Sequence, residues 1–181
     1  MHYCVADYVM DIAQNAVEAG ARNVGIEYRE TETAIEVEVR DDGRGMSEEA
    51  RGRALDPFFT DGIKHPGRSV GLGLPFLVQG VEQAGGDWDL ESGPGSGTRV
   101  SFSFPKGNAD APPEGDLPGL FRALLCLDGD HELVVHRRGG RRVGAQGYEL
   151  RRSELEEALG GLGTAASLGL LREYIESQEE A

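Results

Sequence analysis

Basic side chains are scarce in this chain. Lysine and arginine number 18 against 32 aspartates and glutamates, which gives 181 residues a formal net charge of −14. The deficit is spread evenly, with 10 basic and 18 acidic side chains in residues 1–106 and 8 and 14 in residues 107–181. Repulsion from such a surface argues against non-specific binding of nucleic acid or anionic membrane.

Cysteines and long apolar runs are also few. The two cysteines, Cys4 and Cys126, lie far apart and lack metal-ligand spacing, which favours a reducing cytoplasm over a disulfide framework. No run approaches the roughly 20 apolar residues that span a membrane. The first residues carry Asp7 and Asp11 without a basic lead-in, so they do not form a signal peptide. We expect a cytoplasmic protein that binds neither membrane nor nucleic acid.

Hydrophobic periodicity predicts an ordered N-terminal unit over residues 1–106. Spacings of three and four predict helices, and alternation predicts half-buried strands. We expect an α+β fold, a two-layer α/β sandwich whose mixed, mainly antiparallel sheet carries helices on one face. Residues 57–70, rich in Gly, Pro and charge, are expected to form a lid. The predicted elements are helices at 5–20, 47–56 and 72–83 and strands at 23–29, 34–40, 88–91 and 99–104.

A second, smaller α+β unit of unknown role is predicted over residues 116–181, after a Pro- and Gly-containing linker at 107–115. Its expected elements are a helix capped by Asp116, strands at 132–138 and 141–150 around a Gly139-Gly140 hairpin turn, a helix opened by a capping box at 153–156, and a helix at 168–177. The arginines at 137, 138, 141 and 142 form the one basic cluster of the sequence. They either dock an acidic partner or keep a turn solvated.

Four short segments carry the motifs, in this order: 11–19 (DIAQNAVEA), 41–46 (DDGRGM), 71–75 (GLGLP) and 97–98 (GT). Together they resemble the N box, the two glycine boxes and the closing Gly-Thr of the GHKL superfamily, which includes gyrase, the large heat-shock chaperone, histidine kinases and mismatch-repair ATPases. The resemblance covers roughly residues 5 to 105. It implies an ATP-binding domain of the Bergerat fold, with ATP and Mg²⁺ as cofactors.

The first segment places Asp11, Asn15 and Glu18 on one face of the predicted helix. An amide oxygen is a suitable ligand for Mg²⁺, and the resemblance implies that Asn15 is that ligand. The alternative is that Asn15 only hydrogen-bonds a neighbouring loop. Asp11 takes the position that orients the attacking water or assists transfer in the superfamily, where a longer glutamate is common, so we expect nucleotide binding and leave turnover open.

The second segment follows directly on a predicted strand. The resemblance implies that Asp41 accepts a hydrogen bond from the exocyclic amine of adenine, although Asp-Asp-Gly is also an ordinary turn. Gly43 and Gly45 are expected to adopt positive φ and to let the backbone approach the base, with Met46 closing the box. Thr98 resembles the superfamily threonine that supports this acid, which implies that Thr98 supports Asp41 directly or through water.

The third segment opens a helix, and the resemblance implies that Gly71, Leu72, Gly73 and Leu74 hold the phosphates at its free N–H groups. A P-loop is excluded because the Gly-Lys-Ser/Thr ending is missing, and a Rossmann site because the third glycine is missing. Phe58 resembles the F box that anchors the lid, although core packing explains it equally well. Lys64 is either a lid contact to the γ-phosphate or a solvated charge.

Three functions remain open from the sequence. The first is a kinase-like regulatory protein that lacks its own phospho-acceptor and sensor domains, binds ATP or ADP and acts on a protein partner in trans, similar in architecture to anti-sigma-factor kinases. The second is a slow ATPase with a nucleotide-driven lid cycle. The third is a nucleotide-independent interaction module, which the intact motif set disfavours. Partner and oligomeric state are not recoverable from the sequence.

Overall fold

The computed structural model describes residues 4–56, 73–139 and 147–180. Helices and strands follow one another largely as the periodicity predicts. In chain order they are α1 (Val5–Glu18), β1 (Asn23–Glu30), β2 (Ala34–Asp41), α2 (Glu48–Ala54), α3 (Gly73–Gln83), β3 (Trp88–Ser92), β4 (Thr98–Pro105), α4 (Leu117–Leu125), β5 (Glu132–Arg138), β6 (Tyr148–Arg151), α5 (Arg152–Leu159) and α6 (Ala165–Glu180).

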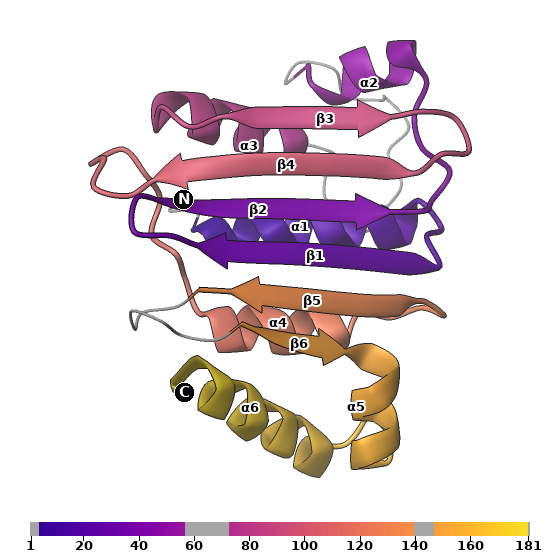
Figure 1. Cartoon of the computed structure of the whole chain (residues 1–181). Helices are drawn as coiled ribbons and strands as arrows, with labels where there is room; N and C mark the ends of the chain where they lie inside the picture. Colours follow the sequence, from indigo (N-terminus) through magenta and orange to yellow (C-terminus); the bar gives the residue numbers. More distant parts are fainter. Residues whose placement is uncertain (1–3, 57–72, 140–146, 181) are drawn as a thin grey trace.

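All six strands belong to one sheet, in the order β3-β4-β2-β1-β5-β6 (Figure 1). Neighbouring strands are antiparallel except β1 and β5, which are parallel. The predicted α+β class with a mixed, mainly antiparallel sheet is therefore confirmed.

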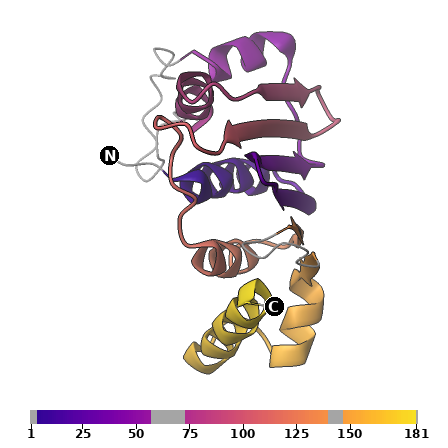
Figure 2. The same ribbon diagram turned by 60° about the vertical axis from the view of Figure 1, so that its left-hand side comes forward.

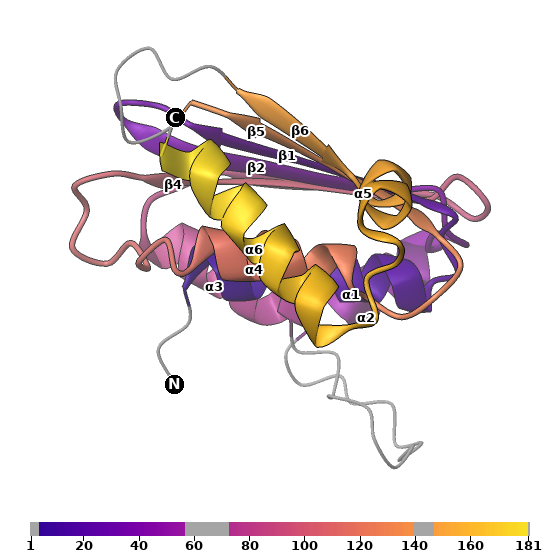
Figure 3. The ribbon, with the colours of Figure 1, turned by 90° about the horizontal axis from the view of Figure 1, so that it is seen from below.

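Helices α1, α3 and α4 cover one face of this sheet (Figure 3). The alternating strand residues of that face are buried, as are the residues of the apolar stripe of α1. In β1, for example, Val24, Ile26 and Tyr28 are at most 1% exposed. Burial of these side chains supplies the main driving force for folding.

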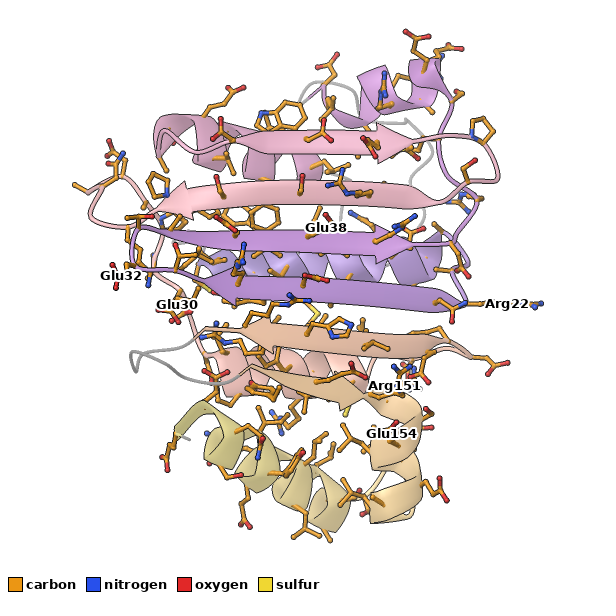
Figure 4. All side chains as sticks on the ribbon, in the orientation of Figure 1. Arg22, Glu30, Glu32, Glu38, Arg151 and Glu154 are labelled. Atoms are coloured by element: carbon orange, nitrogen blue, oxygen red, sulfur yellow. The ribbon has the colours of Figure 1, made fainter. Side chains whose placement is uncertain are left out.

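The opposite face of the sheet is polar. Its ion pairs run between neighbouring strands, for example Arg99 Nε to Glu38 Oε2 at 2.9 Å and Arg29 to Glu36 at 3.5 Å. Glu38 is labelled in Figure 4. Such exposed pairs stabilise a fold by about 0–1 kcal/mol each. This face is thus adapted to water, and the apolar core lies between the sheet and its helices.

The C-terminal strands extend the N-terminal sheet. Residue Val24 of β1 pairs with Leu133 of β5. The segment between the two halves is packed as well, since the first N–H groups of α1, on Val5 and Ala6, donate to the carbonyls of Pro113 and Glu114 at 2.9 and 3.1 Å. The division into domains at 107–115 stays a prediction.

Two local predictions in this part are wrong. Arg137 pairs with Tyr148 across β5 and β6, and this register leaves residues 138–147 between them, which excludes a two-residue turn at Gly139-Gly140. Helix α5 begins at Arg152 without a side-chain cap. Ser153 is thus the second residue of the helix and not its cap, and its backbone N–H donates to Glu132 Oε1 on β5 at 3.2 Å. The predicted cap Asp116 is confirmed, accepting from Gly119 N at 3.0 Å.

Arg137 is not part of an exposed basic cluster. Its side chain is 1% exposed and forms ion pairs with Glu30 at 2.7 Å and Glu179 at 3.1 Å. The guanidinium carbon also lies 5.1 Å from the ring centroid of Tyr28. Arg137 therefore ties β5 to β1 and to α6, whereas its neighbour Arg138 is largely exposed. Residues 141 and 142 lie outside the described part.

Within the described residues, no helix is both long enough and apolar enough to cross a membrane.

Candidate functional site

One end of the sheet brings together three polar residues from three neighbouring strands. Asp41 ends β2, Thr98 begins β4 and Ser92 ends β3, and the registers pair Asp41 with Thr98 and Thr98 with Ser92. Each of them is two residues from a buried side chain of its own strand, so all three lie on the helix-covered face. We call them the cross-strand row.

A cavity of about 220 Å³ opens beside this row, between α1, the loop after β2 and the start of α3. Six of the predicted site residues line it together: Asn15, Asp41, Gly45, Met46, Leu74 and Thr98. Its remaining walls are Ile12, Ala16, Glu18, Ala19, Arg44, Ala54 and Val100. The motifs are thus brought from four separate parts of the chain to one concave site.

The two neighbouring acids, Asp41 and Asp42, have different surroundings. Burial raises the pKa of Asp41 above its ordinary value, an effect that backbone N–H groups of Gly43 and Thr98 partly offset. The Gly43 N–H donates to Asp41 Oδ1 at 2.7 Å. This leaves the half-buried carboxylate of Asp41 with acceptor capacity at the cavity wall.

Asp42 instead stabilises the start of β1 by accepting hydrogen bonds from it. It accepts from Arg22 N at 2.7 Å, from Asn23 N at 2.9 Å and from Asn23 Nδ2 at 2.7 Å. Hydrogen bonds from the Asn23 side chain, together with those from the backbone, lower the pKa of Asp42. The structure therefore distinguishes a cavity-facing acid from a structural one, which the sequence motif alone does not do.

The glycines of the second segment serve contacts between backbones. Gly45 adopts positive φ (61°), as expected, and a Cβ there would lie 1.9 Å from the carbonyl oxygen of Gly93. Gly43 does not adopt positive φ, contrary to the prediction. A Cβ on Gly43 would lie 2.9 Å from Asp41 Oδ1 and 3.0 Å from Ala19 Cβ, so a side chain there would displace the carboxylate.

Helix α1 presents Asn15 and Asp11 one turn apart on the same side. The Asn15 side chain is exposed at the cavity and no hydrogen bond to it is found within the described residues. Burial, followed by repulsion from Asp7, raises the pKa of Asp11. A Cβ on Gly73 would lie 3.2 Å from Asp11 Cβ and 3.3 Å from Asp11 Oδ2, so Asp11 contacts the start of α3.

A single amide side chain suits Mg²⁺ that keeps most of its ligands from water and phosphates. Within the described residues no group of three His, Cys, Asp or Glu side chains could hold a metal ion by itself. The amide of Asn15 fits a metal whose other ligands come from water and phosphates. Phe58, Lys64, Gly71 and Leu72, with the whole predicted lid, lie outside the described residues.

Sequence reasoning missed Ser92. Its Oγ accepts from Met46 N at 2.9 Å, donates to the carbonyl of Gly97 at 2.9 Å and lies 3.0 Å from Thr98 Oγ1. The predicted strand at 88–91 stops one residue short of Ser92, which extends β3 on the same face as buried Leu90. The contacts of Ser92 also depend on the pairing of β3 with β4, which no local pattern supplies.

Comparisons with known proteins point to one family. A family model described as histidine kinase-, DNA gyrase B- and HSP90-like ATPase matches residues 5–108. Sporulation kinase A of Bacillus subtilis (strain 168) is 33% identical over 99 residues, 54% of this chain and 16% of that protein. Sensor histidine kinase ZraS of Klebsiella oxytoca is 35% identical over 100 residues, 54% of this chain and 21% of that protein.

Among solved structures, the nucleotide-free catalytic domain of histidine kinase ThkA is similar to this chain. It is 27% identical with a TM-score of 0.43, and the match covers 55% of this chain and 64% of that one. The chain thus spans 16% and 21% of the two curated relatives and about two thirds of this structural relative.

Proposed function

Because the chain belongs to the histidine kinase-, DNA gyrase B- and HSP90-like ATPase family, we propose that it binds ATP with Mg²⁺ as a kinase-like regulator of a partner protein in trans. The bound nucleotide either donates its γ-phosphate to a side chain of the partner or controls the interaction. The proposal includes a cytoplasmic location, in keeping with the free thiols of Cys4 and Cys126.

The observation that carries this proposal is the shared cavity. Asn15, Asp41, Gly45, Leu74 and Thr98 come from four motifs and line one hollow. Family membership alone would not require this chain to retain the site. A chain whose pocket had decayed would have no reason to keep these side chains together.

In the proposed complex, adenine lies against Asp41 and its exocyclic amine donates to the carboxylate. Guanine carries an acceptor at the equivalent position and would leave the half-buried Asp41 unpaired, which costs on the order of 1–3 kcal/mol. A volume of about 220 Å³ is below the roughly 300–1,000 Å³ of a typical small-molecule site. The cavity thus suits the base and sugar, and the phosphates would extend past Asn15 toward α3.

Mg²⁺ would be held by the amide oxygen of Asn15 and by the phosphates, and it would offset their charge. The charge of the phosphates must be offset because two carboxylates lie nearby. Glu18 lines the cavity, and Asp11 lies one turn from Asn15 and contacts Gly73. These carboxylates repel a bare triphosphate. We therefore expect ATP binding to depend on Mg²⁺ more strongly than it would at a basic site.

A partner in trans is proposed because neither of the two histidines that the structure describes lines the cavity. His136 lies on the uncovered face of the sheet, where Nδ1 is 3.2 Å from Glu149. His131 is buried beside Arg152, with Nε2 3.1 Å from Nη1. His131 directly precedes β5 and His136 lies within it. Strand β1 separates β5 from β2, whose last residue Asp41 lines the cavity (Figure 2).

Slow ATP hydrolysis is the second candidate, favoured by Asp11. A half-buried carboxylate with a raised pKa is suited to general-base work. Its contact with Gly73 supports a position near the phosphates in the proposed complex. Aspartate is one methylene shorter than glutamate, and a misplacement of about 1 Å can cost on the order of 10²-fold in rate.

Calorimetric titration with ATP, ADP and GTP, with and without Mg²⁺, tests the proposal. Wild type should bind ATP and ADP in preference to GTP, and Asp41→Ala should lose that binding. Asp89→Ala is the matched control, because Asp89 is an exposed aspartate on the uncovered face. Normal ATP binding by Asp41→Ala would refute the adenine assignment, and no binding by wild type would refute the function.

Phosphate release over a long incubation separates the two candidates. Release that is lost in Asp11→Asn, with ATP affinity retained, favours the slow ATPase. Tight binding without release favours the regulator, and incubation with radiolabelled γ-phosphate ATP and a cell lysate then seeks the phosphorylated partner.

A further inference from the structure

Ser92 connects two segments of the cavity wall that are distant in the sequence. Met46 belongs to the loop after β2, and Gly97 belongs to the turn before β4. The hydroxyl of Ser92 bridges them, accepting from Met46 N and donating to Gly97 O, both at 2.9 Å. It also lies 3.0 Å from the hydroxyl of Thr98, the middle member of the cross-strand row.

The Ser92–Thr98 contact alone allows either hydroxyl to donate, and one assignment of the protons makes all three contacts of Ser92 hydrogen bonds. A serine hydroxyl has one proton and two lone pairs. In that assignment the proton goes to the carbonyl of Gly97, which can only accept, and one lone pair accepts from Met46 N–H. The remaining lone pair can only accept, so the proton of the Thr98 hydroxyl points at Ser92.

With its proton directed to Ser92, the Thr98 oxygen can offer only lone pairs to a ligand. Thr98 lines the cavity together with Asp41, and the two residues are paired across β4 and β2. The row therefore presents two neighbouring acceptors and no side-chain donor. An amino group with two protons matches this arrangement, and a carbonyl group does not.

We propose that Ser92 is a positioning residue for base selection, which holds the Thr98 hydroxyl as an acceptor so that Asp41 and Thr98 both receive protons of a 6-amino purine. This inference rests on the proposed function, because it assumes that a purine occupies the cavity. It adds the origin of selectivity against 6-oxo purines, whose carbonyl oxygen would face two acceptors.

Ser92→Ala changes this selectivity in a defined direction. Without Ser92 the Thr98 hydroxyl turns freely and donates to a 6-oxo group as readily as it accepts from a 6-amino group. One net hydrogen bond changes affinity by about threefold to tenfold. We therefore expect weaker binding of ATP, stronger relative binding of ITP, and an ATP-to-ITP affinity ratio reduced by about tenfold.

The test is calorimetric titration of Mg-ATP and Mg-ITP into the full chain. Ser92→Thr keeps the hydroxyl and should retain the wild-type ratio. Ser101→Ala is the matched control, since Ser101 is a partly exposed serine of β4 at a position that faces away from the cavity. Thermal unfolding of each variant establishes that titrations are made on folded protein.

The ratio separates base selection from a merely structural role. Loss of packing at Ser92 would weaken ATP and ITP equally, and an unchanged ratio in Ser92→Ala would overturn the inference. If Ser92→Ala does not fold, Thr98→Val removes the acceptor itself and must reduce the ratio likewise, or the inference fails. Failure of wild type to bind ATP would refute the proposed function instead.

Discussion

Removing the Arg137 side chain should destabilise the whole sheet. Three hydrogen bonds hold the guanidinium: Nη2 to Glu30 Oε2 at 2.7 Å, Nε to Glu179 Oε1 at 3.1 Å and Nη1 to the carbonyl of Arg138 at 3.1 Å. Glu30 ends β1, and Glu179 lies in the last turns of α6. Arg137→Ala would leave both carboxylates without their central cation.

The magnitude follows from burial. Side chains of Arg137 and Glu30 are 1% and 8% exposed, and that of Glu179 is 18% exposed. Removing one partner of a buried ion pair costs about 3–5 kcal/mol. At a urea dependence of about 2 kcal/mol per molar, the unfolding midpoint should fall by roughly 1.5–2.5 M. In the variant, Lys106 would still neutralise part of the charge of Glu30, because its Nζ lies 2.7 Å from Glu30 Oε1. We therefore expect a fall in the midpoint near the lower end of this range.

Urea unfolding followed by circular dichroism measures this effect. Arg138→Ala is the matched control: its side chain is 58% exposed and lies 3.7 Å from Glu27, so its loss should cost no more than about 1 kcal/mol. Arg137→Lys keeps the positive charge but lacks the planar guanidinium group, so its unfolding midpoint should lie between those of Arg137→Ala and Arg138→Ala. Equal midpoints for Arg137→Ala and Arg138→Ala would refute the reasoning.

The number of unfolding transitions provides a second test. Because β5 pairs with β1 along seven residues, we expect the entire chain to unfold in one cooperative transition, and Arg137→Ala should lower the midpoint of that transition. Two separated transitions, with only the C-terminal one shifted, would instead support an independent domain over residues 116–181.

Three further outcomes are expected at the site. Asn15→Ala should remove the Mg²⁺ dependence of ATP binding, measured by calorimetry, while its exposed neighbour Gln14→Ala should retain it. Burial raises the pKa of Asp41, so acidification should protonate this acceptor and weaken ATP binding at a higher pH than an ordinary aspartate would; affinity unchanged down to the ordinary aspartate range would contradict this. Gly45→Ala should impair folding or binding, because a Cβ meets the Gly93 carbonyl, whereas Gly52→Ala in α2 meets nothing within 4 Å and should stabilise by about 0.5–1 kcal/mol in thermal unfolding.

Acid should also weaken the Arg137 network. Although burial of Glu30 opposes it, hydrogen bonds from Lys106 and Arg137 hold the pKa of Glu30 below its ordinary value. A carboxyl with a lowered folded-state pKa stabilises the fold above its ordinary pKa, and this stabilisation is lost as the pH falls. The midpoint difference between wild type and Arg137→Ala should therefore shrink on acidification from about pH 4.5 downward.

Local patterns predicted the elements of the N-terminal half well. The stripe that begins at Val5 predicts α1, and alternation predicts β1 and β2 within a residue or two of their ends. These elements are amphipathic on their own, so their periodicity does not depend on what they pack against. The same holds for the cap at Asp116, which is a local hydrogen bond.

The C-terminal half shows where local reasoning fails. Parallel pairing of β5 with β1 joins residues more than 100 positions apart, and no local pattern encodes it. Arg137 is a different case, because Leu133, Val135 and Arg137 alternate onto the buried face. The burial of Arg137 was not predicted, because the residue was interpreted as one of four clustered arginines and its place in the alternation was not used.

The cross-strand row shows which part of a site a sequence can specify. Asp41, Thr98 and Ser92 lie just beyond the predicted strands at 34–40, 99–104 and 88–91. In the structure each extends its strand and is two residues from a buried side chain, so all three face the core. Their meeting depends on two registers, Asp41 with Thr98 and Thr98 with Ser92. A slip of one residue between β2 and β4 would place an outward-facing residue opposite Asp41 and remove the Thr98 acceptor from the cavity. The motif residues therefore indicate which chemical groups the site contains, and the long-range pairing of the strands brings these groups together in one binding site.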